Sequence, residues 1–362
     1  MKKSPEKVFI IRPNISVQSA ESHISLGLMK GFLDLDLNCE IIENIKNITY
    51  GNQGILIIDD LCNYKSDIDL KHAKRLSRKG IVIALWVHWP IFEDSKFYEF
   101  HKKLILNNLD AFQIIYGERE PNSMGDFEVL TNRKYNTIPN ASPSLPKENL
   151  IIKSKDNKKN NFDIVFIGSK MKSKSFLFNK VLPLLKKNYP NLKIGLFGRG
   201  FNKRVRIANG IIKISNKFIK PISKKLNLFI NKKMKFLNEV ITKERELLIY
   251  QNSKICINYH EDTPRHIIYN LRYFKIPYYG GFQLVDAPLK LSPYFNNDEV
   301  IHIDSLDEKY WVKKNYYYLN NPIERNRVKD KGYKRAINNH SYKDRAKKFL
   351  ILYNDILNDC IN

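Results

Sequence analysis

Short apolar runs alternate with segments of helical periodicity through the first part of the chain. The runs have the length of buried strands and cover residues 8–11, 39–42, 54–60, 81–87 and 111–116. The segments at 22–32 and 71–79 have the spacing of helices. Continuous apolar strands separated by helices are typical of a parallel sheet covered on both faces. The pattern predicts an N-terminal Rossmann-like domain over residues 1–145.

A polar stretch at residues 146–161 interrupts this pattern and has the composition of a linker. Strand-like runs then return at 164–169, 193–198, 254–258 and 300–303, and an apolar stripe from Ser341 predicts a terminal helix over 341–359. We therefore expect an α/β fold in which two Rossmann-like domains face each other across a cleft, followed by C-terminal helices. The second domain would cover residues 162–362.

The segment at residues 201–238 has an unusual charge pattern. It carries eleven Lys and Arg residues without an Asp or Glu, and its apolar positions from Ile219 to Leu237 step by three, four or one. Such a pattern predicts an exposed basic amphipathic helix, cleanest after Pro221, that lies on an anionic membrane surface. The alternative is a basic helical excursion that is merely solvated.

The whole chain is strongly basic, with 62 Lys and Arg against 37 Asp and Glu and a formal charge of +25. This excess predicts a polyanionic neighbour, namely nucleic acid, an anionic membrane surface or a phosphorylated substrate. The codon bias of an AT-rich genome is the alternative explanation.

The four cysteines are far apart, which indicates a reducing compartment and no structural zinc. The apolar stretch at 81–92 is too short to span a bilayer. We therefore expect a cytoplasmic protein, peripheral on the inner face of the membrane.

Two glycine turns are candidate anion-binding sites. Gly168, Ser169 and Lys170 lie between a predicted strand and a predicted helix, where a phosphate could be held. Gly280 and Gly281 follow a helix and precede a strand, so their amides could approach an anion. The chain contains neither GxxxxGK[ST] nor GxGxxG, which argues against a P-loop enzyme and a dinucleotide-dependent dehydrogenase.

Cations cluster shortly before the second glycine turn. Arg265, His266 and Arg272 lie within eight residues, and Lys275 follows one helical turn after Arg272. This spacing could place positive charges beside a diphosphate. A solvated basic helix face explains the same spacing without a ligand.

The stretch at residues 244–286 contains several short sequence motifs in a characteristic order. A helix ending in Tyr-x-x-Ser at 250–253 leads into a strand that ends at Asn258. A second helix carries Arg-x-Phe at 272–274, and a Gly-Gly-Phe turn occupies 280–282. This order resembles the C-terminal half of the CgeB-like (spore maturation protein) glycosyltransferases of the large group 1 family.

The resemblance covers about residues 138–350. Its other matching residues are Asn140 and Ala141, Phe166 to Ser169, Phe197 and Gly198, and His340 to Tyr342 with Arg345. The resemblance implies the GT-B architecture, a donor-binding second domain, an acceptor-binding first domain and a terminal helix that packs back on the first domain. It also implies a nucleotide-sugar co-substrate with no further cofactor and no metal.

The chain departs from the family at Lys275, where the family has a Glu that accepts hydrogen bonds from the ribose of the nucleotide. An ammonium group cannot accept a hydrogen bond. Either the donor is held differently here, through a phosphate, or a donor contact has been lost. A third interpretation is that Lys275 is a surface helix residue that does not align with the family Glu.

Two histidines are candidate catalytic residues. His88 follows the strand at 81–87 and would be a general base or an acceptor contact, because ligands bind outside the carboxyl ends of parallel strands. A histidine in an aromatic wall beside Trp86 and Trp89 is the structural alternative. His260 ends a strand of the second domain and would contact the transferred sugar or the leaving phosphate.

Together these features predict a sugar-nucleotide-dependent glycosyltransferase with a glycan or lipid-linked acceptor at the cytoplasmic membrane face. Two alternatives stand beside it. A glycosyltransferase that modifies nucleic acid would use the positive charge for phosphate contacts. A non-catalytic protein that binds a nucleotide-sugar or a glycan would explain Lys275 in place of Glu.

Overall fold

The structure is a computed structural model of the 362-residue chain. It describes residues 4–11, 20–48, 53–58, 70–87, 106–118, 127–142, 161–198, 200, 234–237, 241–260, 269–286 and 293–359.

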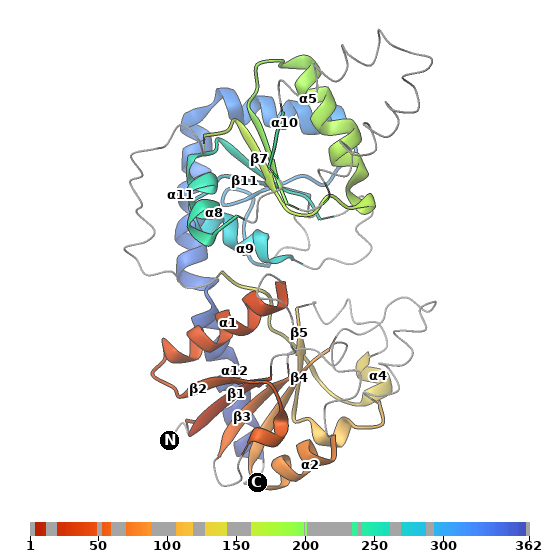
Figure 1. The fold of residues 1–362 in the computed structure, drawn as a ribbon, viewed down its shortest axis with the longest axis vertical. Coiled ribbons are helices and arrows are strands. Elements are labelled where there is room, and N and C mark those ends of the chain that lie inside the picture. The colour runs from red at the N-terminus through yellow and green to blue at the C-terminus, as the bar shows by residue number, and fades with distance from the viewer. Residues whose placement is uncertain are drawn as a thin grey trace. The chain divides into compact units, whose positions relative to one another are not determined.

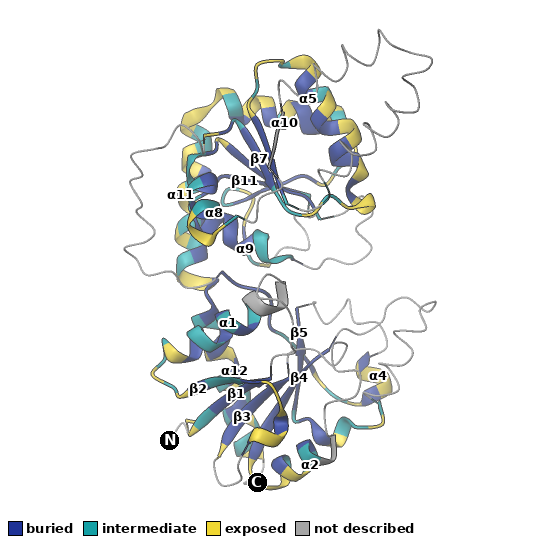
Figure 2. Ribbon diagram, in the orientation of Figure 1, coloured by how far each residue is buried: buried dark blue, intermediate teal, exposed yellow. Residues whose placement is uncertain are grey.

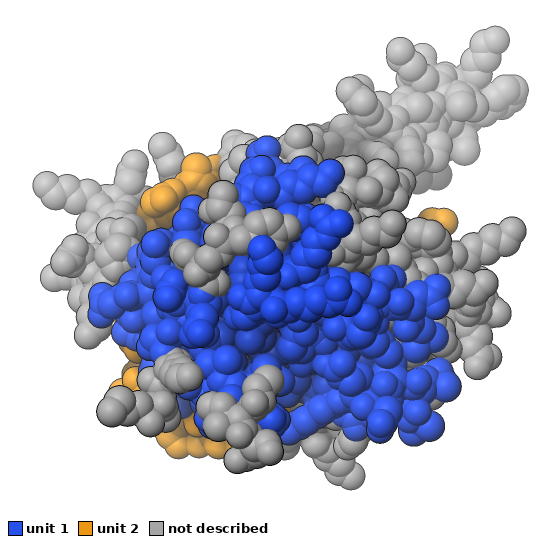
Figure 3. Space-filling model, turned by 90° about the horizontal axis from the view of Figure 1, so that it is seen from below, with its two compact units in different colours: residues 1–144, 266–271, 339–362 blue, residues 145–265, 272–338 orange. Residues whose placement is uncertain are grey.

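The chain forms two compact units, which Figure 3 colours separately. Each unit is built around its own parallel sheet (Figure 1). Unit 1 comprises residues 1–144, 266–271 and 339–362, and unit 2 comprises residues 145–265 and 272–338. Both sheets carry helices, and helices also end the chain, so the predicted α/β class with C-terminal helices is confirmed.

The sheet of unit 1 has the strand order β2-β1-β3-β4-β5-β6, and all neighbouring strands are parallel. Its strands are β1 Lys7–Ile11, β2 Cys39–Ile42, β3 Gly54–Ile58, β4 Ile81–Trp86, β5 Ile114–Gly117 and β6 Tyr135–Thr137. Every residue of β3 and β4 is buried, as expected for central strands covered on both faces (Figure 2).

Alternate residues of these strands point to two separate apolar layers. Val8 and Ile10 of β1 pack in one layer with α1 Ala20–Leu33 and α12 Tyr342–Asp359. Phe9 and Ile11 pack in the other layer with α2 Leu70–Arg78, α4 Phe127–Thr131 and the short 3-10 helices η1 Ile45–Asn47 and η3 Leu109–Ala111. The two-residue period of a strand divides the core in this way.

The last helix, α12, belongs to unit 1 and packs against α1. The contact is close because α1 presents two glycines. A Cβ on Gly27 would lie 2.3 Å from the Tyr342 ring, and a Cβ on Gly31 would lie 2.3 Å from the Tyr342 carbonyl oxygen. The Arg345 side chain then donates to the carbonyl oxygens of Pro139, Asn140 and Asn339. These bonds fix α12 to the chain segment that follows β6.

The sheet of unit 2 has the order β12-β11-β10-β7-β8-β9, again with parallel neighbours. Its strands are β7 Ile164–Ile167, β8 Ile194–Phe197, β9 Met234–Leu237, β10 Ile255–Asn258, β11 Gln283–Val285 and β12 Ile301–His302. The chain adds strands on one side of β7 and then on the other side, beginning with β10. The strand order therefore reverses between β7 and β10.

Helices cover both faces of this sheet. The face that includes Leu196, Ile257 and Leu284 packs against α10 Glu308–Asn320, α5 Leu182–Asn188, the preceding π-helix η8 Leu177–Val181 and Val328 of α11 Pro322–Asn339. On the opposite face, Cys256 contacts the Tyr250 carbonyl of α8 Lys243–Asn252, and the next helix along the chain is α9 Leu271–Tyr278.

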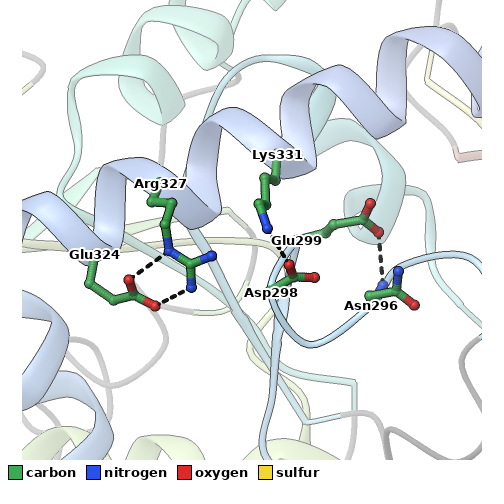
Figure 4. A network of polar contacts seen from close by, with 6 residues as sticks. All are labelled: Asn296, Asp298, Glu299, Glu324, Arg327 and Lys331. Atoms are coloured by element: carbon green, nitrogen blue, oxygen red, sulfur yellow. Dashed lines mark hydrogen bonds and ion pairs between the residues drawn. The ribbon is translucent and has the colours of Figure 1, made fainter.

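One exposed ion pair joins α11 to the loop before β12, and further polar contacts lie within each of the two segments (Figure 4). Lys331 bonds Asp298 at 2.5 Å, and the Arg327 guanidinium makes two bonds to Glu324 within α11. Glu299 accepts from the Asn296 amide at 2.8 Å. Exposed pairs of this kind contribute little to stability. Gly332 of α11 brings the helix and this loop into close contact, because a Cβ there would lie 2.3 Å from the Glu299 carbonyl oxygen.

The prediction of a basic helix over 201–238 is wrong for residues 234–237. Met234–Leu237 form strand β9, which pairs in parallel with β8 from Ile194↔Met234 to Phe197↔Leu237. Met234 and Phe236 alternate with Lys235, a period of two that suits a sheet edge and that the helical interpretation overlooked. Residues 201–233 and the predicted linker through residue 160 lie outside the described residues. No helix in the described ranges is long and apolar enough to cross a bilayer.

We expect Gly31→Ala to destabilise unit 1. The new Cβ would overlap the backbone of Tyr342, and relieving that overlap should cost about 1–3 kcal/mol, more than the gain of up to about 1 kcal/mol in helix propensity. Urea unfolding monitored by circular dichroism measures the change.

Lys30→Ala, at the neighbouring position of the same helix, is the control. It removes only an exposed ion pair with Asp34, so it should change stability by less than about 0.5 kcal/mol. A Gly31→Ala protein as stable as wild type would contradict the close α1–α12 contact.

Candidate functional site

The candidate site lies in unit 2 at the carboxyl ends of the strands where the order reverses. Gly168 directly follows β7, Tyr259 and His260 follow β10, and Asp286 follows β11. Because these strands are parallel, all four residues lie at the same edge of the sheet. Open parallel sheets bind ligands at this edge, at the point of reversal.

Arg272, the second residue of α9, bridges the two strands at the reversal. Its Nη1 donates to the Ile167 carbonyl oxygen at the end of β7 (2.8 Å) and its Nε donates to Asn258 Oδ1 at the end of β10 (3.2 Å). The guanidinium carbon also lies 5.3 Å from the centre of the Phe166 ring. Nη2 makes no hydrogen bond to any residue in the described part of the chain. A guanidinium fixed in this way presents donors in the planar fork that phosphate oxygens accept.

Glycine in the turn after β7 leaves room for the Arg272 guanidinium beside it. A Cβ on Gly168 would lie 1.8 Å from Arg272 Nη1. Gly198, after β8, is equally constrained, because its Cβ would lie 2.4 Å from the Gly168 carbonyl oxygen and its φ is +123°. The two glycines therefore allow the turns to pack on each other and on the guanidinium.

Two lysines bring further positive charge to this turn. Lys174, at the end of the 3-10 helix η7 Lys172–Lys174, is buried, and its ammonium lies 5.6 Å from the centre of the Phe166 ring. Lys170 lies 5.6 Å from the Phe178 ring centre. The sequence analysis identified Gly168, Ser169 and Lys170, but not Lys174. Its only signal was a Lys four residues beyond Lys170, indistinguishable from the many lysines of this chain.

Burial lowers the pKa of the Arg272 guanidinium, and the nearby Tyr250, Asp286 and Glu246 act in the opposite direction. A guanidinium is such a strong base that Arg272 stays protonated at neutral pH. Its burial matters in another way. A cation that is already partly desolvated loses less hydration when an anion binds, so its contact with a phosphate is stronger than at an exposed surface.

His260 is held by Asp286, a residue that the sequence analysis did not select. The His260 ring contacts Asp286 Oδ1 through Nδ1 at 2.5 Å, and its backbone amide donates to Asp286 Oδ2 at 2.6 Å. The two side chains are only 17% and 8% exposed. The carboxylate thus fixes the ring orientation and places a proton on Nδ1, which makes Nε2 the nitrogen suited to accept a proton or a hydrogen bond.

Lys275 is engaged within the protein. Its ammonium bonds Glu246 Oε2 of α8 at 2.5 Å, with side-chain exposures of 8% and 12%, and lies 5.8 Å from the Tyr279 ring centre. Burial, followed by the charge of Glu246, raises the pKa of the Tyr250 hydroxyl well above its ordinary value. Lys275 is therefore a buried helix residue paired with a carboxylate, and α8 and α9 are joined by this pair.

Gly280 and Gly281 lie away from Gly168. They precede β11, so they sit at the amino edge of the sheet, whereas Gly168 lies at the carboxyl edge. Their amides donate to the carbonyl oxygens of Pro277 and Ile276 in the last turn of α9, and Gly280 has a φ of +71°. Helix termination accounts for both glycines.

The predicted residues His88 and Arg265 lie outside the described residues and stay predictions.

We expect Lys275→Ala to destabilise unit 2, because it leaves the Glu246 carboxylate, whose side chain is only 12% exposed, without its cation. Breaking a buried pair from one side costs about 3–5 kcal/mol. Thermal unfolding at neutral pH measures the loss. Lys331→Ala, which breaks the exposed pair with Asp298, is the control and should cost less than about 1 kcal/mol.

The exchange Lys275→Glu with Glu246→Lys restores an ion pair at the same place. It should recover a large part of the stability that Lys275→Ala loses. Equal stability of Lys275→Ala and wild type would show that the pair does not hold α8 and α9 together.

Comparison with known proteins supports the enzyme class. Residues 184–351 match the model of a family described as glycosyl transferase-like. None of the curated proteins compared with this sequence matches it.

Solved structures with the same fold cover most of the chain. An alpha-glucosyltransferase in complex with UDP and a 13-mer DNA containing an HMU base is 13% identical, with a TM-score of 0.61 over 97% of this chain and 100% of that one. The N-terminal domain of trehalose-6-phosphate phosphatase from Candida albicans is 11% identical, with a TM-score of 0.59 over 97% of both chains.

TarM from S. aureus, in complex with Fondaparinux, alpha-GlcNAc-glycerol and UDP, is 15% identical with a TM-score of 0.55 over 83% of this chain. The match spans 55% of the TarM chain, so it covers little more than half of that protein. At these identities the likeness shows the fold, which is that of the GT-B glycosyltransferases. The chain thus has the fold of the GT-B glycosyltransferases. The match of residues 184–351 to a glycosyl transferase-like family supports the predicted enzyme class, a glycosyltransferase.

Proposed function

We propose that this protein is a glycosyltransferase that takes its sugar from a nucleotide-sugar and holds the diphosphate of that donor at the carboxyl edge of the unit 2 sheet. The observation that carries the proposal is the position of Arg272. Its guanidinium lies where the strand order reverses and is fixed to the ends of β7 and β10.

The cations around the β7 turn suit a diphosphate. Arg272 and Lys174 both lie against the Phe166 ring, and Lys170 follows two residues after Gly168. In sugar transfer, negative charge develops on the departing diphosphate as its bond to the sugar breaks. Fixed cations stabilise that charge without having to reorganise during the reaction. The role of these residues is therefore both donor binding and stabilisation of the leaving group.

His260 is assigned to the sugar or to the phosphate next to it. It follows β10, the strand to which Arg272 is fixed, and Asp286 orients its ring. A histidine whose Nδ1 bonds a carboxylate can accept a hydrogen bond from a hydroxyl, or donate one to a phosphate oxygen when protonated. Asp286 acts through His260 and is a positioning residue.

Lys275 stands where the resemblance implies a Glu that binds the donor, and it has a different role here. Its ammonium is paired with Glu246 and so is not the partner of a phosphate. Donor affinity then rests on the diphosphate contacts of Arg272, in agreement with the interpretation that the donor is held through a phosphate. The non-catalytic alternative is not needed to explain Lys275.

For the acceptor, a glycan or lipid-linked molecule at the inner membrane face remains the first proposal. Its support is the basic segment at 201–238, considered as sequence. A nucleic-acid acceptor is the second candidate. It is favoured by the net charge of +25 and by the alpha-glucosyltransferase crystallised with DNA, whose whole chain is covered by the match. Binding to a duplex that weakens steeply with salt would favour the second candidate.

We expect Arg272→Ala to weaken the binding of UDP or a UDP-sugar by about 1.5–3 kcal/mol, which is roughly a 10- to 150-fold rise in Kd. The guanidinium would contact the phosphates directly, so its loss removes charge-assisted hydrogen bonds. Isothermal titration calorimetry measures the affinity, and thermal unfolding confirms that the variant is folded.

Arg327→Ala removes an exposed guanidinium of the same unit and should leave the affinity unchanged. Arg272→Lys keeps the charge but not the planar fork, and should bind with intermediate affinity. A folded Arg272→Ala protein that binds the donor as tightly as wild type would remove Arg272 from the donor site.

A further inference from the structure

Exposed apolar and aromatic side chains gather on and beside α10 of unit 2. The helix exposes three tyrosines, Tyr310, Tyr316 and Tyr317. Leu306, just before the helix, and Ile323, just after it, are also exposed. Single exposed apolar side chains are normal, whereas a concentration of them is typical of a surface that contacts a protein or a membrane.

Lysines lie among these tyrosines on the outer side of α10. Two adjacent stripes of the helix, each with steps of four and three residues, carry the side chains: Lys309, Lys313 and Tyr316 form one, and Tyr310, Lys314 and Tyr317 form the other. The opposite side holds the buried residues Trp311, Asn315 and Tyr318. Burial in the core therefore does not account for the exposed tyrosines.

The π-helix η8 and helix α5 extend this surface (Figures 1 and 2). They pack on the same face of the sheet as α10. Tyr189, which ends α5, stacks on Tyr316 with the ring centres 4.7 Å apart and the ring planes at 12°. Lys180 of η8 and Lys187 of α5 are exposed. We call the exposed residues of η8, α5 and α10 the α5–α10 face.

The α5–α10 face is basic as well as aromatic. Residues 177–188 contain no Asp or Glu, and α10 contains only Glu308, at its first position. Lys187, Lys309 and Lys313 form no ion pair with any residue in the described part of the chain. Their charges are thus available to an anionic partner.

The position of α10 in unit 2 gives this face a place relative to the chemistry. The helix follows β12, so it begins near the carboxyl edge of the sheet. The proposed donor site lies at the same edge, at the ends of β7 and β10. A partner of the α5–α10 face would therefore lie beside the donor site.

Charge and ring packing decide between the possible partners. A second copy docked through the same face would bring lysines against lysines, because a twofold contact is self-complementary. Nucleic-acid bases stack on rings with free faces. Tyr189 and Tyr316 stack on each other instead, and the Lys314 ammonium lies 5.4 Å from the centre of the Tyr310 ring.

An anionic bilayer suits both residue types of the face. Tyrosine rings are enriched at the level of the lipid headgroups, where the ring is in an apolar layer and the hydroxyl in water. Lysine places its apolar stem along such a surface while its ammonium reaches the lipid phosphates.

We propose that the α5–α10 face rests on an anionic phospholipid surface. Tyr310, Tyr316 and Tyr317 lie at the level of the headgroups, and Lys309 and Lys313 contact the lipid phosphates. The inference goes beyond the proposed function, because it assigns a membrane contact to a folded surface of unit 2. It depends neither on the segment at 201–238 nor on the donor site.

The test places an environment-sensitive fluorophore on this face. The full chain carries Tyr317→Cys with Cys62→Ser and Cys360→Ser, and the new thiol is labelled with a nitrobenzoxadiazole group. Cys39 and Cys256 are buried and are kept. Vesicles of phosphatidylglycerol and phosphatidylcholine are the probe, and vesicles of phosphatidylcholine alone are the uncharged comparison.

We expect the anionic vesicles to shift the emission of the label at position 317 to shorter wavelength, because the label enters a less polar layer. Phosphatidylcholine alone should give little shift. The matched control is the same label at Lys334→Cys, an exposed position in the second half of α11, and it should not respond.

Charge reversal tests the lysines by cosedimentation with the same vesicles. Lys309→Glu combined with Lys313→Glu should weaken binding to anionic vesicles about tenfold or more, because attraction becomes repulsion at the contact. Lys134→Glu combined with Lys334→Glu changes the net charge equally at exposed positions elsewhere, so it should weaken binding less than about threefold. Unchanged UDP affinity shows that the variants are folded.

Several outcomes would overturn the proposal. One is the absence of binding to anionic vesicles, and another is binding that leaves the emission at position 317 unchanged. Equal losses in the two charge-reversed proteins would reduce the effect to net charge. A response at position 317 to a DNA duplex but not to vesicles would assign the face to nucleic acid instead. UDP binding is measured separately, so none of these outcomes counts against the donor site.

Discussion

The guanidinium of Arg272 lies between the two strands on which unit 2 reverses its strand order. It ties the Ile167 carbonyl at the end of β7 to the Asn258 side chain at the end of β10. Other features of the site follow from this placement. The guanidinium occupies the space that a Cβ on residue 168 would fill, and Gly198 approaches the Gly168 carbonyl more closely than a residue with a Cβ could. The carboxyl edge of the sheet is thereby shaped around a cation.

The helix that carries Arg272 is itself held at several points. Lys275 of α9 pairs with Glu246 of α8, and the helix ends at Gly280, whose positive φ few other residues adopt. Gly281 lets the chain pass within contact of Ile276 and Cys256. These constraints fix α9 along the sheet, so that its first turn stays at the strand ends. In the sequence, Lys275, Gly280 and Gly281 look like donor contacts. In the structure they hold α9 in place and so position Arg272.

The sequence allowed the two sheets to be predicted because their strands are continuous apolar runs between glycines and helices. The sequence also selected Gly168, Arg272 and His260 as candidates, since each stands beside a strand end or a family motif, and the structure brings them to one edge of a sheet. Asp286 was missed as the partner of His260 because 26 residues separate them and only the pairing of β10 with β11 brings them together. Strand β9 was missed because four residues of alternating pattern are too few to outweigh a long helical pattern.

Lys174 was missed for a similar reason. In the sequence a buried lysine looks like an exposed one, and only the fold places Lys174 against Phe166. Long-range packing decides such cases, and the pattern of a single sequence does not record it.

The most direct test of the account is amide hydrogen exchange measured by mass spectrometry with and without saturating UDP. UDP should slow exchange in peptides covering residues 166–174 and 258–260 and the first turn of α9, where the diphosphate would meet Gly168 and Arg272. Peptides from α11 and from the strands of unit 1 should exchange at the same rate in both conditions. Bound UDP that leaves the 166–174 peptide unprotected, or that protects only peptides of unit 1, would contradict a donor site at the reversal between β7 and β10.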